Sequence, residues 1–107
     1  MNNLNSALIE GRVISKPLYK DFVNDLSVCT FTIETINYVK RGENIEKQIS
    51  NIDIQTRGKF ADLCKGIKDK GVRVVGKVMQ DRMGIGDEEK LLPRIYIEAE
   101  HIEIRAA

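Results

Sequence analysis

The residues best suited to chemistry in this chain are cationic side chains, accompanied by a single tyrosine near its middle. Lysine and arginine neutralise phosphate groups, and a phenol ring can stack on an unpaired base. The candidate nucleic-acid-binding residues are Tyr38, Lys40, Arg41, Lys47, Arg57, Lys59, Arg73, Lys77 and Arg82. The alternative is an ordinary solvated surface, on which Glu43, Glu46 and Asp53 cancel the positive field. For the tyrosine, packing beneath a hairpin is about as common as stacking.

Catalytic and metal-binding chemistry have little support in the sequence. His101 is the only histidine, and the two cysteines, Cys29 and Cys64, form neither a CxxC motif nor a Cys/His pair. Both cysteines occupy apolar patterns, which predicts small buried hydrophobic residues in a reduced cytoplasm. No nucleophile elbow or carboxylate pair is recognisable. We therefore expect no enzyme activity, no cofactor and no metal site.

Length and composition indicate one soluble domain. The chain has 107 residues, of which 31% are charged and 42% apolar, and its net charge is +1. This length is sufficient for a single hydrophobic core, and residues 1–107 are predicted to form one domain. A net charge so close to zero says nothing about a polyanionic partner by itself. The N-terminus has no basic start or long apolar run, so we expect no signal peptide and a cytoplasmic location.

Alternating apolar and polar residues predict five strands, over residues 4–15, 26–38, 45–57, 72–83 and 91–104. Gly11 within the first strand suggests a bulge or a sharp bend that helps a small barrel to close. Residues 20–25 are expected to form a turn or short ribbon, and residues 40–44 and 84–90 form loops. The alternation slips between Ala99 and His101, which predicts a bulge. Tyr19 and Phe22 could either line a groove or pack beneath the first loop.

One helix interrupts the strands, and its position indicates the fold. Phe60, Leu63, Cys64 and Ile67 recur with the three/four spacing of an amphipathic helix, predicted over residues 59–69. From this periodicity, Phe60 is expected to anchor the helix in the core. A lone short helix between the third and fourth of five strands is the layout of an OB-fold, a partly open five-stranded barrel. The outer face and loops of that fold commonly hold single-stranded nucleic acid.

Several segments together resemble the bacterial single-stranded DNA-binding protein family, and the resemblance extends over essentially the whole chain. The opening run from Met1 to Val13 is similar to the first strand of that family, and Lys16-Pro17 followed by Lys20 resembles its Asp-Pro-Glu-Leu-Arg. The run Gly58-Lys59-Phe60-Ala61-Asp62 resembles the motif Gly-Lys-X-Ala-Glu, which is the most specific match. The run from Lys70 to Val78 resembles Lys-Gly-X-X-Val-X-Val-Glu-Gly-X-Leu.

The resemblance implies a protein that coats single-stranded DNA without sequence preference in replication, recombination and repair. Members of the family stack bases on aromatic residues of the outer sheet face. Tyr38 matches one of those positions, whereas Asn51, Arg57 and Met83 match the other three, and the chain contains no tryptophan. Arg57 can stack its guanidinium group on a base, and Met83 can offer an apolar contact. With fewer aromatic platforms, we expect weaker and more salt-dependent binding than is typical of the family.

The last predicted strand lies close to the final residue of the sequence, so we expect no acidic tail for recruiting other proteins, which would be a departure from the family. In this respect the chain is similar to the short primosomal protein PriB, which implies an alternative function. That alternative is an OB-fold accessory factor that mainly binds protein partners of the primosome and binds single-stranded DNA weakly. The resemblance also implies a homo-oligomer formed through first-strand pairing, with a tetramer favoured and a dimer possible. The expected partners are single-stranded DNA and further copies of the chain, and no membrane is involved.

Overall fold

The computed structural model describes residues 2–22, 26–84 and 91–105, and most of them lie in strands. The elements in chain order are β1 (Ala7–Val13), β2 (Leu18–Phe22), β3 (Leu26–Arg41), β4 (Asn44–Arg57), α1 (Lys59–Leu63), β5 (Gly71–Gly84) and β6 (Leu91–Arg105). Five of these strands correspond to the five predicted from alternation. Most of the predicted 84–90 loop lies outside the described residues. Within the described ranges, no helix is long and apolar enough to cross a membrane.

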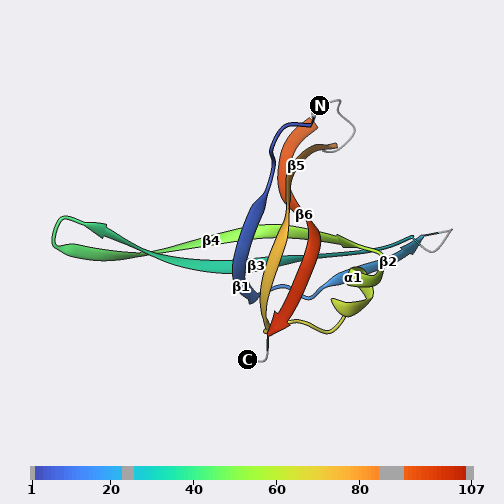
Figure 1. Cartoon of the computed structure of the whole chain (residues 1–107), viewed down its shortest axis with the longest axis horizontal. Coiled ribbons are helices and arrows are strands. Elements are labelled where there is room, and N and C mark those ends of the chain that lie inside the picture. Colours follow the sequence, from blue (N-terminus) through green and yellow to red (C-terminus); the bar gives the residue numbers. More distant parts are fainter. Residues whose placement is uncertain (1, 23–25, 85–90, 106–107) are drawn as a thin grey trace.

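The strands form a closed barrel. They follow the order β1-β5-β6-β4-β3-β2, and an additional pairing of β1 with β3 closes the ring. The β4–β6 pairing is parallel and is recorded at Ile54↔Ile97 and Gln55↔Glu98, whereas the other pairings are antiparallel. One short helix lies between β4 and β5, as Figure 1 shows. The prediction of an OB-fold is confirmed.

Alternating residues of the barrel strands point inward and form one core. The residues of this core are Val13, Cys29, Phe31, Ile33, Ile54, Ala61, Cys64, Ile67, Val72, Val74, Ile97 and Ile102. Both cysteines are free and fully buried, as predicted. Burial raises the pKa of the Cys64 thiol to about 12, and the neighbouring Cys29 adds to this rise. The thiols therefore behave as small apolar residues at neutral pH.

Gly11 allows β1 to cross β3 at very short range. A Cβ atom on this residue would lie only 2.4 Å from the backbone oxygen of Glu34. Immediately after it, β1 pairs with β3 at Arg12↔Glu34 and Val13↔Ile33, which closes the barrel. The register around Gly11 is regular, so of the expected bulge or sharp bend the bulge is absent, and the glycine acts through close approach of two backbones.

Two long hairpins extend from the barrel in different directions (Figure 1). The first hairpin joins β3 and β4, and its strands pair from Val28↔Arg57 to Arg41↔Asn44. The strand that we expected to end at residue 38 therefore continues to Arg41, because the two strands pair as far as a tight two-residue turn. The second hairpin joins β5 and β6, and its register slips between Val75↔His101 and Gly76↔Ala99. The bulge predicted near Ala99 is thus confirmed, and Glu100 is the extra residue.

The helix is shorter than the sequence predicts. It begins at Lys59 after Gly58, which has a φ of 63°, and ends at Leu63. Turns follow from Cys64, and Asp69 has a φ of 70°, so helical geometry is not maintained to residue 69. Leu63 was expected on the buried face but is 55% exposed, whereas Ala61 and the residues after the helix, Cys64 and Ile67, are buried.

Two aromatic residues hold the helix against the barrel. Phe60 packs against the core as predicted, and its ring meets that of His101 edge-on, with centroids 5.6 Å apart. Tyr19 lies in β2, one residue before the turn or short ribbon expected over residues 20–25, and packs against the core. Its hydroxyl donates to Asp62, at 2.6 Å, and this hydrogen bond raises the pKa of Tyr19 to about 12. Tyr19 thus packs beneath the helix, and the Phe22 side chain lies outside the described residues.

Candidate nucleic-acid interface

The largest group of candidate residues lies on one face of the β3–β4 ribbon. We define the outer face as the even-numbered residues of β3 and the odd-numbered residues of β4, which point away from the core. Tyr38 lies directly opposite Lys47, Lys40 lies opposite Ile45, and Arg57 lies opposite Val28. Residues opposite one another in an antiparallel pair project to the same side of the sheet. Four of the predicted residues, namely Tyr38, Lys40, Lys47 and Arg57, therefore share this face.

The outer face is long enough to hold several nucleotides. Lys47 and Arg57 are separated by about ten residues of β4, which corresponds to roughly 33 Å at the rise of a strand. Asn51 lies between them on the same face and is exposed. Tyr38 is 69% exposed, so its ring is accessible to a stacking partner. A single strand could thus contact cations at both ends and a ring near one end.

Lys77 extends this surface from β4 across β6 to β5. Glu98 of β6 lies beside Gln55 of β4 and directly opposite Lys77 of β5. The Nε atom of Arg57 donates to the same Glu98 carboxylate, at 2.9 Å. Arg57, Glu98 and Lys77 therefore lie on adjacent strands of the barrel exterior. The Tyr38, Arg57 and Lys77 positions belong to one continuous surface.

The remaining candidate residues lie elsewhere. Arg41 projects to the opposite side of the hairpin and pairs with Glu46 at 3.0 Å. Arg73 pairs with Glu10 at 2.9 Å on the β1–β5 side of the barrel. Lys59 belongs to α1, with its Nζ atom 5.3 Å from the centroid of the Phe60 ring. Arg82 is in β5, but its side chain, like that of Met83, lies outside the described residues.

Sequence reasoning missed a trough at the Arg57 end of the outer face. Two adjoining hollows, with volumes of about 220 and 540 Å³, lie between β2, β3, β4 and β6. They share Leu18, Thr30 and Arg94, and their lining includes the cations Lys16, Lys20 and Arg57. Apart from its place in the family resemblance, Lys20 has no feature in the sequence that marks it as a binding residue. The available signal was the alternation of β2, which places Leu18 and Lys20 opposite Thr30 and Val28, on the outer side.

Positive charge exceeds negative charge in this trough. Its one lining carboxylate, Asp53, accepts a hydrogen bond from the Thr32 hydroxyl at 2.8 Å. Arg94 has only a long ion pair with Asp81, at 3.9 Å. Within the described ranges, no carboxylate lies at ion-pair distance from Lys16 or Lys20. Lys16, Lys20 and Arg94 can therefore contact an anion without first breaking a strong internal pair, whereas Arg57 is already paired with Glu98 at 2.9 Å.

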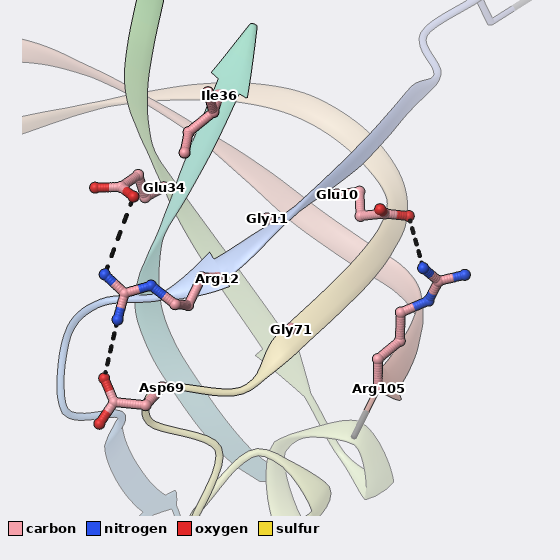
Figure 2. A pocket seen from close by; sticks show the side chains of 8 residues that line it. All are labelled: Glu10, Gly11, Arg12, Glu34, Ile36, Asp69, Gly71 and Arg105. Atoms are coloured by element: carbon pink, nitrogen blue, oxygen red, sulfur yellow. Dashed lines mark hydrogen bonds and ion pairs between the residues drawn. The ribbon is translucent and has the colours of Figure 1, made fainter. Parts of the chain in front are cut away.

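A third hollow, of about 480 Å³, lies at the crossing of β1 and β3 and differs in its electrostatics (Figure 2). Arg12 lies between Glu34 and Asp69, at 4.0 and 3.2 Å, and Arg105 is 3.5 Å from Glu10. The hydrogen bond from Arg73, together with Arg105, lowers the pKa of Glu10 below its ordinary value. Because its arginines are matched by carboxylates, this hollow is a poor site for a polyanion.

The described part of the chain contains no group of side chains that could hold a metal ion. Across residues 2–22, 26–84 and 91–105, no three His, Cys, Asp or Glu side chains lie close enough together to hold an ion. The proposed interface offers cations and the exposed ring of Tyr38, which suit phosphate contacts and stacking.

Comparison with known proteins identifies the family. Residues 4–103 match the sequence profile of the single-strand binding protein family. The chain belongs to this family. A comparison with curated protein sequences gives no significant match.

Solved structures of family members share the fold of this chain. The Plasmodium falciparum SSB in complex with ssDNA is 17% identical and superposes with a TM-score of 0.87, over 99% of this chain and 98% of that protein. A deletion mutant of the single-stranded DNA binding protein from Thermus aquaticus is 14% identical and superposes with a TM-score of 0.81. That match covers 96% of this chain but only 51% of the Thermus protein, so the chain spans about half of its length.

Proposed function

We propose that this chain coats single-stranded DNA without sequence preference and acts in replication, recombination and repair. The observation that carries the proposal is the shared orientation of Tyr38, Lys47 and Arg57 on one exposed face of a member of the single-strand binding protein family. The cations of this face contact phosphates, and the ring stacks on a base. Neither contact depends on base identity, so binding is independent of sequence.

The composition of the face sets the character of binding. Tyr38 is the only aromatic residue on it, since the other ring positions suggested by the family resemblance hold Asn51, Arg57 and Met83. Each base that stacks on an aromatic residue contributes about 1–3 kcal/mol. Because this face has fewer aromatic residues on which bases can stack, phosphate contacts supply a larger share of the binding energy. Affinity therefore falls steeply with salt.

We further propose a homo-oligomer, with a tetramer favoured over a dimer, that forms through the β1 edge. On one side β1 pairs with β5 from Ala7 to Arg12, whereas its β3 pairing is recorded only at Arg12 and Val13. Leu8 at this edge is 70% exposed and lines a hollow with Ile9, Ile36 and Ile52. An accessible strand edge that carries an exposed leucine favours pairing with a second copy.

The second candidate is a PriB-like accessory role, in which the outer face mainly binds protein. It is favoured by the exposed apolar residues Ile36, Ile45 and Ile49, which lie on the same face as Tyr38. Apolar and aromatic side chains together are typical of protein-binding surfaces. In that role, single-stranded DNA binds only weakly.

The test is fluorescence polarisation of a labelled oligo-dT, titrated with the protein at several salt concentrations. We expect micromolar or tighter binding at low salt, which weakens in Tyr38→Ala and Arg57→Glu. Thermal melting of each variant establishes that it is folded. If the wild-type protein has no affinity for oligo-dT even at low salt, single-stranded DNA coating is wrong and the protein-binding role is favoured.

A further inference from the structure

A stacked pair of side chains, Arg94 and Tyr96 of β6, stands beside the trough. The Cζ atom of Arg94 lies 4.8 Å from the centroid of the Tyr96 ring. Tyr96 is only 7% exposed, whereas the Arg94 side chain is 28% exposed. The ring is thus buried, and part of the Arg94 side chain above it remains open to solvent.

The strand register places this pair on the same exterior surface as the proposed interface. Arg94, Tyr96 and Glu98 are alternate residues of β6, so they project to one side. Glu98 contacts Arg57 there, at 2.9 Å. Arg94 also lines both hollows of the trough, together with Leu18.

We infer that Arg94, supported by Tyr96, is a base-stacking platform for one unpaired nucleotide, and that the base lies in the trough beside Leu18. This inference rests on the proposed binding of single-stranded DNA and names a part of the site that holds a base. A guanidinium group is planar and stacks on flat π-systems, so it can replace an aromatic ring. The Tyr96 ring on one side already restricts its orientation. Little side-chain entropy is then lost on binding.

The trough has the shape and chemistry that this ligand requires. Its larger hollow, of about 540 Å³, is within the size range of small-molecule sites. Leu18 is 64% exposed at the edge of the hollow and offers an apolar contact to the second face of a base. Lys20 lines the same hollow and can contact the phosphate. An arginine that only stabilised the fold would need neither the hollow nor the exposed leucine beside it.

The experiment separates stacking from charge. Arg94→Lys retains the positive charge but removes the planar guanidinium group. Lys20→Ala removes a phosphate contact. Each variant is titrated against labelled oligo-dT and against an oligonucleotide of equal length that carries abasic residues. Arg41→Lys, on the opposite side of the hairpin, is the matched control, and thermal melting confirms that each variant is folded.

We expect Arg94→Lys to weaken oligo-dT binding by about fivefold or more, which corresponds to the lower range for one stacked base. Its affinity for the abasic strand and its salt dependence should stay close to those of the wild type. Lys20→Ala should weaken binding to both strands by a similar factor and reduce the slope of log affinity against log salt by about 0.7. Arg41→Lys should bind both strands like the wild type.

The inference is overturned if folded Arg94→Lys binds oligo-dT like the wild type, or if it loses affinity for the two strands by the same factor. In either case the wild-type protein still binds and Tyr38→Ala still weakens binding, so the proposed function stands. If the wild-type protein binds neither strand, the proposed function fails, and the inference fails with it. Tyr96→Leu provides a second variant, since loss of the supporting ring should reduce the preference for oligo-dT over the abasic strand.

Discussion

The two sides of the β3–β4 hairpin allow a matched test of which side binds DNA. Lys47 projects from the outer face, directly opposite Tyr38. Arg41 projects from the other side and pairs with Glu46 at 3.0 Å. Lys47→Ala and Arg41→Ala change the net charge by the same amount, at sites in the same hairpin. A difference between the two variants therefore reports local contact with DNA and not the overall field of the protein.

The expected size of the effect follows from counterion release. Each phosphate contact with a single strand contributes about 0.7 to the slope of log affinity against log salt. At about 0.1 M monovalent salt, one such contact corresponds to roughly a fivefold change in affinity, or about 1 kcal/mol. We expect this loss for Lys47→Ala. Arg41→Ala removes a cation that points away from the strand, so its affinity should stay within about twofold of the wild type.

The assay is polarisation of labelled oligo-dT across a salt series from about 50 to about 300 mM, the range in which such slopes are measured. The expected result is a slope lowered by about 0.7 in Lys47→Ala alone. Equal losses in the two variants would refute the assignment of the outer face, because a general field effect would then account for binding. A larger loss in Arg41→Ala would place the DNA on the opposite side.

Three further predictions concern the fold and the assembly. Gly11→Val should lower the melting temperature by several degrees or more in thermal circular dichroism. The valine Cβ would lie 2.4 Å from the backbone oxygen of Glu34, and overpacking of this kind costs about 1–3 kcal/mol of stability. An unchanged melting temperature would contradict the proposed role of Gly11. Burial raises the pKa of Cys64 to about 12, whereas its ordinary pKa is about 9. The neutral thiol therefore contributes fully to the stability of the fold below pH 9, and this contribution is lost as the pH rises from about 9 towards 12. The melting temperature of Cys64→Ala should accordingly fall less steeply over this interval, and an identical slope would argue against a buried neutral thiol. Leu8→Arg should lower the mass measured by light scattering if copies pair along β1, whereas an unchanged mass would exclude that edge.

Much of the fold could be predicted from the sequence because alternation reports which side of a strand is buried. The residues Cys29, Phe31 and Ile33 of β3 have this pattern, and all three are buried. The slip in the pattern near Ala99 likewise marked the bulge at Glu100. The helix was predicted too long because the apolar spacing continues to Ile67, although the backbone leaves helical geometry after Leu63. Spacing alone does not distinguish a helix from turns that bury the same residues.

The sequence alone could predict which candidate residues share a face only for residues that belong to the same hairpin. Tyr38 and Lys47 fall on one face because strand alternation places them there. The sides taken by Lys40 and Arg41 could not be assigned, since the strand was expected to end at residue 38 and neighbouring residues of a strand point in opposite directions. The trough combines Leu18 and Arg94, which are distant in sequence and meet only through the packing of β2 and β6 around β3 and β4. No local pattern contains that information.

The most direct test of the binding face is the set of NMR chemical-shift changes produced by titration with oligo-dT. We expect the largest changes at Tyr38, Lys47, Arg57 and Arg94, on the outer face and in the adjoining trough. Changes concentrated instead at Glu10, Arg73 and Arg105, on the β1–β5 side, would contradict it.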